Sequence, residues 1–242
     1  MIEYFIADPT GNITLLVTSP VAEEERTALA KKLLSAEPEA EQLGFLEGNK
    51  LHMSGGEFCG NASMSAAALI LGGSGETELV VSGCSEAVPV KIERLAEGSF
   101  AGRVTMPEPE RIFTFEAENE RLPAVKFPGI THIICRNGMS PEEAKEAAPR
   151  WCRALDCEAL GIMLLSGNRM TPVVYVSGIE TLFEENSCAS GTAAVGVYFA
   201  AESGERVSLE LIQPGGALKV EAENGSRPAL YGKVRLSEKK FI

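Results

Sequence analysis

Two uncharged runs of small residues constrain most strongly what this chain can fold into. One covers residues 58–75 and the other residues 186–201, and both are rich in Gly, Ala and Ser rather than Leu and Ile. A helix that is small or apolar on every side has to be enclosed on every side, whereas a membrane span is dominated by large aliphatic residues. We therefore expect two helices buried inside a folded protein, one in each half of the chain.

The sequence around these runs also repeats. Matching segments are separated by 119 residues for one pair of asparagines (168 − 49) and by 129 residues for two cysteines (188 − 59). The increase in separation between the first pair and the second predicts an insertion of roughly ten residues in the second copy, near residues 173–184. The matches, all in the same order, pair Ser19-Pro20 with Ser140-Pro141, Leu43-Gly44 with Leu160-Gly161, Gly48-Asn49 with Gly167-Asn168, Cys59 with Cys188, and Gly102-Arg103-Val104 with Gly232-Lys233-Val234.

Each copy predicts the same order of elements. Strands at residues 2–7 and 13–18, and later at 131–135, precede an amphipathic helix that begins at Ser-Pro, where serine can cap the helix and proline fits its first turn. Short strands, the buried helix and three more strands follow. We expect the last strands at residues 78–82, 87–94 and 102–106, and at 207–212, 218–222 and 230–236.

The predicted fold class is therefore α+β with an internal duplication. Two similar domains, residues 1–110 with Cys59 and residues 111–242 with Cys188, would each wrap a mostly antiparallel sheet round a central helix. The joining segment lies near residues 106–120, and the final strand is able to pair with the N-terminal half. We expect the active site in a cleft between the domains.

Charge excludes several classes of partner. The chain has 22 Lys and Arg against 34 Asp and Glu, a net charge of −12, so it lacks the basic surface that nucleic acids and anionic membranes require. The first residues show no basic segment followed by an apolar one, so we expect a cytoplasmic protein. A small molecule is the expected partner, and a homodimer is left open.

Cys59 and Cys188 each stand between a polar loop and a small-residue helix. A thiol at a helix N-terminus meets unpaired N–H groups and the positive end of the helix dipole, which favour a thiolate. Two such thiols at repeat-equivalent positions can remove a proton from one face of a tetrahedral carbon and return one to the other face. That chemistry is racemisation by two bases, and the helix ends would bind the α-carboxylate of the substrate.

The other cysteines fit no metal or disulfide pattern. Cys152 and Cys157 lie five residues apart without a second pair, only two histidines are present, and burial is the expected role for both and for Cys135. Cys84, between a strand and a turn, is interpreted as structural. We expect no metal, and we expect no organic cofactor because neither a phosphate-binding glycine motif nor a lysine in a Gly-rich loop is present.

The two cysteine motifs, CGN at residues 59–61 and CASGT at residues 188–192, resemble those of the diaminopimelate epimerase superfamily of cofactor-independent amino-acid racemases. The chain is most similar to the histidine racemases of opine metallophore biosynthesis. The similarity covers most of the chain except about residues 108–160. It rests on PTGN at 9–12, EQLGF at 41–45, MSGGEFCGNASMS at 53–65, VSGCS at 81–85, ENSCASGTAAVGV at 185–197 and QPGG at 213–216.

The resemblance implies roles for individual residues. Cys59 and Cys188 would be the catalytic bases, Asn12 would contact the amino acid, and Glu185 or Glu184 would hold its ammonium group. Ala189 stands where glycine usually follows the second cysteine, and alanine would be strained there if the position requires a positive φ. The carboxylate-binding helix ends would comprise Gly60, Asn61, Ala189, Ser190, Gly191 and Thr192.

Histidine is the predicted substrate. Glu41 could accept a hydrogen bond from the imidazole, and Gln42 or His52 could meet its other nitrogen. The segment before Cys188 has no arginine to hold the distal carboxylate of diaminopimelate. Two alternatives remain at this point: a diaminopimelate epimerase or related isomerase, and a catalytically degenerate amino-acid-binding protein.

Overall fold

The computed structural model describes residues 1–117 and 120–242 and divides the chain into two compact units. Unit 1 contains residues 1–105 and 231–242, and unit 2 contains residues 106–230. We predicted a division at residue 110, with the last strand able to pair with the N-terminal half. The chain returns to unit 1 at Tyr231, and the final strands hydrogen-bond to the first one.

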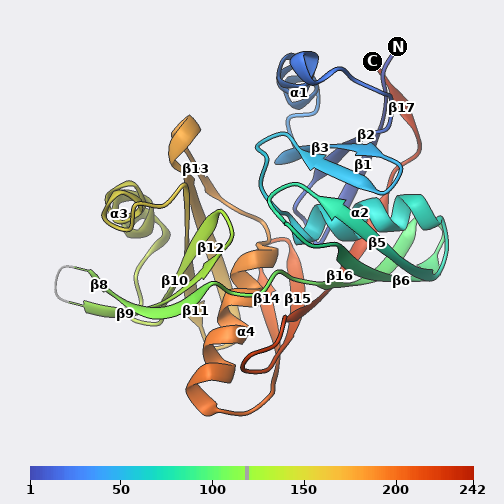
Figure 1. Cartoon of the computed structure of the whole chain (residues 1–242). Coiled ribbons are helices and arrows are strands. Elements are labelled where there is room, and N and C mark those ends of the chain that lie inside the picture. Colours follow the sequence, from blue (N-terminus) through green and yellow to red (C-terminus); the bar gives the residue numbers. More distant parts are fainter. Residues whose placement is uncertain (118–119) are drawn as a thin grey trace. The chain divides into compact units, whose positions relative to one another are not determined.

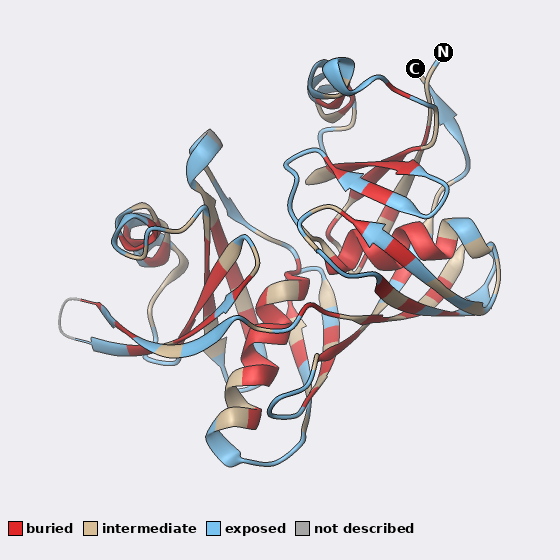
Figure 2. Cartoon of the chain, in the orientation of Figure 1, coloured by how far each residue is buried: buried red, intermediate tan, exposed pale blue. Residues whose placement is uncertain are grey.

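Unit 1 is a sheet that closes on itself around one helix. The central helix α2 (Gly60–Leu71) is buried at every residue from Gly60 to Ala68, and Figure 2 shows this part of α2 in red. The second helix is α1 (Glu23–Ala36). The strands are β1 (Glu3–Pro9), β2 (Thr14–Val17), β3 (Gln42–Glu47), β4 (Lys50–Met53), β5 (Gly75–Val81), β6 (Val88–Ala96), β7 (Ser99–Thr105), β16 (Ala229–Leu236) and β17 (Lys240–Phe241).

Strand pairing explains why α2 is enclosed. Each strand from β1 to β7 pairs with the next, β7 pairs with β16, and β16 returns to β1. Helix α2 packs on β1, β5, β6 and β7. Gly102 of β7 permits this packing, because an added Cβ would lie 2.9 Å from the sulfur of Met64 in α2.

Unit 2 has its own buried helix, α4 (Ala189–Ser203), which contacts β9, β10, β11, β14 and β15 (Figure 1). A second helix, α3 (Pro141–Ala154), lies over β11 and β12 and closes a separate apolar core. The strands are β8 (Arg111–Ala117), β9 (Glu120–Phe127), β10 (Ile130–Cys135), β11 (Ala159–Ser166), β12 (Arg169–Val176), β13 (Thr181–Glu184), β14 (Val207–Gln213) and β15 (Gly216–Ala222), with a short 3-10 helix at Ser177–Ile179.

The two units share an order of pairing. In unit 1, β2 and β3 are parallel with α1 between them, β3 and β4 are antiparallel, β4 and β5 are parallel, and β5 and β6 are antiparallel. Strands β10, β11, β12, β14 and β15 follow the same sequence, with α3 after β10. Strand β13 and the 3-10 helix precede α4 and have no counterpart before α2. They fall near the insertion expected at residues 173–184.

The helix that follows Ser19-Pro20 starts later than expected. Ser140 caps α3 through a reciprocal capping box with Glu143, as predicted, but α1 begins only at Glu23 and its N-cap, Ala22, offers no side-chain bond. The Ser19 hydroxyl instead accepts the Glu3 N–H at 2.8 Å. Ser19 therefore ties the start of β1 to the chain after β2, and the prediction that it caps α1 is wrong.

Within the described residues, no helix is long and apolar enough to cross a membrane.

Candidate active site

Cys59 is the N-cap residue of α2. Its backbone is extended, and its sulfur accepts the Ala62 N–H at 3.4 Å. The Ser63 hydroxyl donates to the Cys59 carbonyl at 2.7 Å. Cysteine thus occupies a position where Ser, Thr, Asp or Asn usually satisfies the first-turn N–H groups, and its sulfur lies at the positive end of the helix dipole.

A chain of polar side chains leads to this sulfur. The Gln42 amide lies 3.3 Å from the Cys59 sulfur and also donates to Asn12 Oδ1 at 2.5 Å and to the Thr14 hydroxyl at 2.8 Å. Asn12 in turn donates to the Glu41 carboxylate. Asn12 is only 5% exposed and Thr14 is fully buried, so each has to be hydrogen-bonded to be stable there. The structure therefore brings Asn12, Glu41 and Gln42 together beside Cys59.

The turn before Asn12 is held in an uncommon conformation. Thr10 and Gly11 both have positive φ, 59° and 85°, and the Gly11 N–H donates to the Asp8 carboxylate at 2.6 Å. A left-handed threonine is costly, and such residues concentrate at functional sites. The turn delivers Asn12 to the N-terminus of α2, where Asn61 donates to Asn12 Oδ1 at 3.3 Å.

Cys188 is the N-cap residue of α4 with nearly the same geometry. Its sulfur accepts the Gly191 N–H at 3.4 Å, and the Thr192 hydroxyl donates to its carbonyl at 2.7 Å. Gln213 at the end of β14 accepts the Cys188 N–H at 2.8 Å and donates to the Thr192 hydroxyl at 2.9 Å. Gly191 is required here, because an added Cβ would lie 2.1 Å from the sulfur of Met163.

The environment of Cys188 favours the thiol over the thiolate. Burial raises its pKa well above the ordinary value, and the neighbouring Glu185 carboxylate, which is hydrogen-bonded to it, raises it further. The Gly191 N–H and the Ser190 hydroxyl lower the pKa but do not outweigh the first two causes. The helix N-terminus was expected to lower the pKa of Cys188; the Gly191 N–H acts in that direction, but burial and Glu185 raise the pKa overall.

The two candidate ammonium-binding glutamates have different partners. Glu185 contacts Cys188, whereas the Glu184 carboxylate lies 2.7 Å from Lys145 Nζ in α3. The structure therefore brings Glu185 to the cysteine and directs Glu184 to a helix on the surface.

His52 is not part of the network around Gln42. It lies on the exposed face of β4, where alternate residues Leu51 and Met53 are buried, and its charged neighbour is Glu57. Burial raises the pKa of Glu57, and the charge of His52 opposes that effect.

A family model, the histidine racemase CntK N-terminal domain, matches residues 1–237 of this chain. The chain belongs to this histidine racemase family. A histidine racemase of Fusobacterium nucleatum is 30% identical over 93% of this chain and 90% of its own length, and one of Staphylococcus aureus is 30% identical over 97% and 94%. A predicted epimerase of Pseudomonas aeruginosa shares the fold, with a TM-score of 0.74 at 16% identity over 100% of this chain and 99% of its own.

The resemblance read from the two cysteine motifs is thereby confirmed, and the protein is an isomerase that acts as an amino-acid racemase. The α+β fold class is confirmed as well. Ala189, the departure from the usual glycine in this racemase, is the first residue of α4 and is not among the residues with positive φ. Ala189 therefore does not carry the backbone strain that a positive φ would cause.

His132 of this racemase was not predicted as a site residue from the sequence. This residue of β10 is fully buried, and its Nε2 lies 2.9 Å from the Ser190 hydroxyl, which in turn lies 3.7 Å from the Cys188 sulfur. Burial lowers the pKa of His132 to about 3, so the ring is neutral. A histidine inside the apolar segment Thr131–Cys135 was the available signal, but its contact with Ser190 spans 58 residues.

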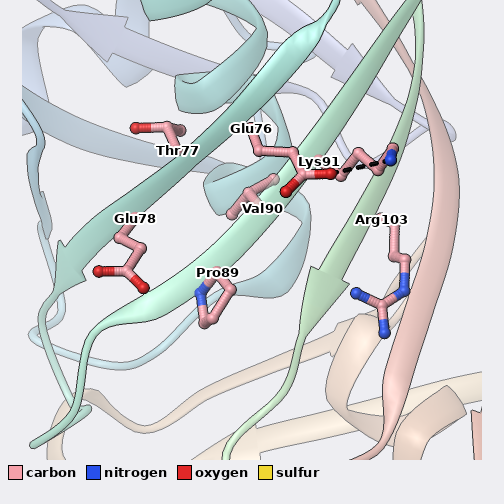
Figure 3. A pocket seen from close by; sticks show the side chains of 7 residues that line it. All are labelled: Glu76, Thr77, Glu78, Pro89, Val90, Lys91 and Arg103. Atoms are coloured by element: carbon pink, nitrogen blue, oxygen red, sulfur yellow. Dashed lines mark hydrogen bonds and ion pairs between the residues drawn. The ribbon is translucent and has the colours of Figure 1, made fainter.

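Figure 3 shows a shallow groove on unit 1, lined by seven residues of β5, β6 and β7, among them Glu76, Lys91 and Arg103. Glu76 and Lys91 form an exposed ion pair at 2.8 Å. None of the predicted site residues lines this groove. Among the described residues, no three His, Cys, Asp or Glu side chains are grouped as a metal site would require.

Proposed function

We propose that the protein interconverts L- and D-histidine with Cys59 and Cys188 as its two acid–base groups. The observation that carries the proposal is the placement of both cysteines as N-caps of the two buried helices, each sulfur 3.4 Å from a first-turn amide nitrogen. The shared order of strand pairing supports a duplication in which the cysteines hold equivalent positions.

The reaction needs one thiolate and one thiol at the start of each turnover. The thiolate takes the proton from Cα, electrons move toward the α-carboxylate, and the thiol delivers its proton to the opposite face of the same carbon. The configuration inverts and the two sulfurs exchange protonation states, so the enzyme is then ready for the reverse reaction. This step requires no external oxidant or reductant, because only protons are transferred.

The surroundings of the sulfurs favour Cys59 as the thiolate of the unliganded enzyme. Two N–H donors, from Ala62 and Gln42, point at the Cys59 sulfur and stabilise negative charge. Cys188 is more deeply buried and lies beside the Glu185 carboxylate, which favours a proton on its sulfur. We assign the first proton removal to Cys59 and the first proton delivery to Cys188.

The helix ends would stabilise the charge that builds up on the substrate. We assign the amides of Gly60 and Asn61 in α2, and of Ala189 and Ser190 in α4, to the α-carboxylate. Oriented N–H groups at a helix N-terminus bind anions and gain strength as the carboxylate becomes more negative. In this assignment Glu185 holds the ammonium group beside Cys188.

Glu41 is the proposed acceptor for the imidazole N–H of histidine. Its carboxylate is already fixed by Asn12, so it would bind the ring without first losing much freedom. The Gln42 amide already hydrogen-bonds to Asn12, Thr14 and Cys59. These bonds support a role for Gln42 at the Cys59 sulfur rather than at the imidazole ring of the substrate. His52 stays an alternative ring contact. The relatives named as histidine racemases support this choice of substrate.

The test combines substrates with single cysteine variants. Purified protein is incubated with each free L-amino acid and the D-isomer is measured by chiral chromatography; histidine should give the highest kcat/KM. Cys59→Ser and Cys188→Ser should each lower kcat by about 100-fold or more, because an alcohol is a far weaker acid than a thiol.

Cys84→Ser is the matched control, since Cys84 lies in a turn after β5 and should leave kcat unchanged. Near-normal turnover by either of the first two variants would contradict the two-thiol mechanism. A higher kcat/KM for diaminopimelate or for an aliphatic amino acid would contradict the choice of histidine.

A further inference from the structure

A second pair of cysteines lies outside the proposed catalytic machinery. Cys152 is in the last turn of α3 and Cys157 follows the helix, just before β11. Their sulfurs are in direct contact, 3.3 Å apart. The Cys152 thiol also lies 2.9 Å from the Cys157 carbonyl oxygen, and the Cys157 thiol lies 3.6 Å from the Cys152 carbonyl oxygen. Within the described residues no third ligand joins them to form a metal site.

The backbone between the two cysteines is already fixed in a tight reversal. Asp156 has a positive φ of 47°, and the Cys157 N–H donates to the Cys152 carbonyl at 3.2 Å. Because folding has brought the sulfurs together, a bond between them needs little further ordering of the chain. A disulfide requires the sulfurs to close to about 2 Å, which is a small movement from their present contact.

The two thiols differ in access to solvent. Cys152 is buried at 1% exposure among Trp151, Ala148 and the strands beneath α3, whereas Cys157 is half-buried. An oxidant arriving from solvent therefore meets Cys157 first, with Cys152 in contact behind it. This is the arrangement of an attacking thiol and a resolving thiol.

We propose that Cys152 and Cys157 form an intramolecular redox pair that hydroperoxides convert to a disulfide. The Cys157 sulfur attacks the O–O bond of the hydroperoxide and becomes a sulfenic acid, releasing water or an alcohol. The Cys152 sulfur then attacks the Cys157 sulfur, and the sulfenic oxygen leaves as water. Two thiols are oxidised by two electrons, one peroxide bond is reduced, and a dithiol reductant reverses the change.

The disulfide would link the last turn of α3 covalently to the segment just before β11. Both elements contribute to one apolar core, which contains Ala147, Ala148, Trp151, Cys152, Leu160 and Ile162. Burial and the adjoining Cys152 raise the pKa of Cys157 to about 12, and the charge of Asp156 raises it as well. At neutral pH Cys157 is therefore a thiol that reacts slowly, so the disulfide should accumulate under sustained peroxide and not during brief handling in air.

Peptide mapping of the oxidised protein tests the proposal directly. Arg153 separates the two cysteines, so trypsin places Cys152 in a peptide of residues 151–153 and Cys157 in a peptide of residues 154–169. After treatment of the folded protein with hydrogen peroxide and alkylation of remaining thiols, these peptides should be recovered joined, with two hydrogens fewer than their sum. Reduction should separate them.

Two variants and one reference cysteine make the result decisive. Cys157→Ser should abolish the joined peptide and leave Cys152 alkylated, and Cys152→Ser should leave a sulfenic or sulfinic acid on Cys157. Cys84, which is partly exposed and lies in unit 1, whereas the pair lies in unit 2, serves as the reference for peroxide reaching the protein. Recovery of alkylated Cys152 and Cys157 after sustained peroxide treatment, from protein whose Cys84 is fully oxidised, would overturn the proposal. The test does not depend on racemase activity.

Discussion

His132 is a buried titratable group in unit 2, and the free energy of unfolding should therefore depend on pH. Its pKa falls from about 6.5 in an unfolded chain to about 3 in the fold because of burial. Between these values the unfolded chain binds one more proton than the folded one, so stability decreases as the pH falls.

For His132 the loss in free energy of unfolding should be about 2 kcal/mol between about pH 7.5 and about pH 5. Urea unfolding at a series of pH values measures it. His132→Gln, which keeps a donor for Ser190, should remove most of the decrease, and His52→Asn should not, since His52 is exposed. Equal slopes in wild type and His132→Gln would show that the folded protein accommodates a charged His132.

Glu185 should control both substrate binding and the ionisation of Cys188. Glu185→Gln removes a carboxylate that raises the pKa of Cys188, so alkylation of Cys188 by iodoacetamide should shift to lower pH. The loss of a charged partner for the ammonium group should raise KM about tenfold or more.

Glu184→Gln is the control for this change, because Glu184 contacts Lys145 and the pair is partly exposed. It should leave KM and the alkylation profile of Cys188 unaltered. If Glu184→Gln raised KM and Glu185→Gln did not, the ammonium assignment would have to be reversed.

The residues of the site could be predicted only in part. Cys59 and Cys188 stand out in the sequence because helix N-caps are local features, and the PTGN turn marks Asn12 for the same reason. Gln213 begins the QPGG segment and His132 interrupts an apolar segment, but their contacts could not be predicted because they reach their partners from distant strands, at separations of 25 and 58 residues. Burial of Cys188, which reverses the expected direction of its pKa shift, also depends on the whole fold.

At the level of elements, the two outer helices differ in how they begin. Ser140 and Glu143 form a reciprocal capping box on α3, whereas Ala22 precedes α1 with an extended backbone and no side-chain acceptor. Ser140→Ala should therefore lower the free energy of unfolding by about 1 kcal/mol, and Ala22→Ser should raise it by up to about 1 kcal/mol. Thermal or urea unfolding of both variants measures the two shifts.

The reverse outcome, with no loss from Ser140→Ala, would mean that α3 is held entirely by its packing on β11 and β12. Trp151 and the alanines beneath it supply that packing, so the comparison separates capping from burial.

Strand β8 was not predicted from the sequence. Apolar residues alternate at Phe113, Phe115 and Ala117, and this alternation was the available signal for a strand. From the sequence, this segment is instead assigned to the region near residues 106–120 that joins the two predicted domains. Ser19, by contrast, matches Ser140 in sequence but bonds to β1, so equal motifs led to different structures through tertiary contacts.

At the scale of the whole molecule, the two uncharged runs of small residues predicted more of the fold than any single motif. Residues 58–75 and 186–201 are uncharged because each helix is enclosed by strands of its own unit, and that demand is visible in composition alone. The two units share the same order of parallel and antiparallel pairings. The sequence predicted the order of the strands along the chain, but it did not predict which strands are parallel and which are antiparallel. The return of the chain to unit 1 at Tyr231 depends on the long-range pairing of β16 with β1.

The central claim is that two different sulfurs handle the proton on the two faces of one carbon. Incubation of the enzyme with L-histidine in D₂O, stopped after a small fraction has reacted, tests it most directly. Two bases predict deuterium at Cα in nearly all of the D-histidine formed, and almost none in the L-histidine recovered at the same time. Protium retained in the D-product, or deuterium appearing equally early in the recovered L-substrate, would indicate a single base and contradict the account.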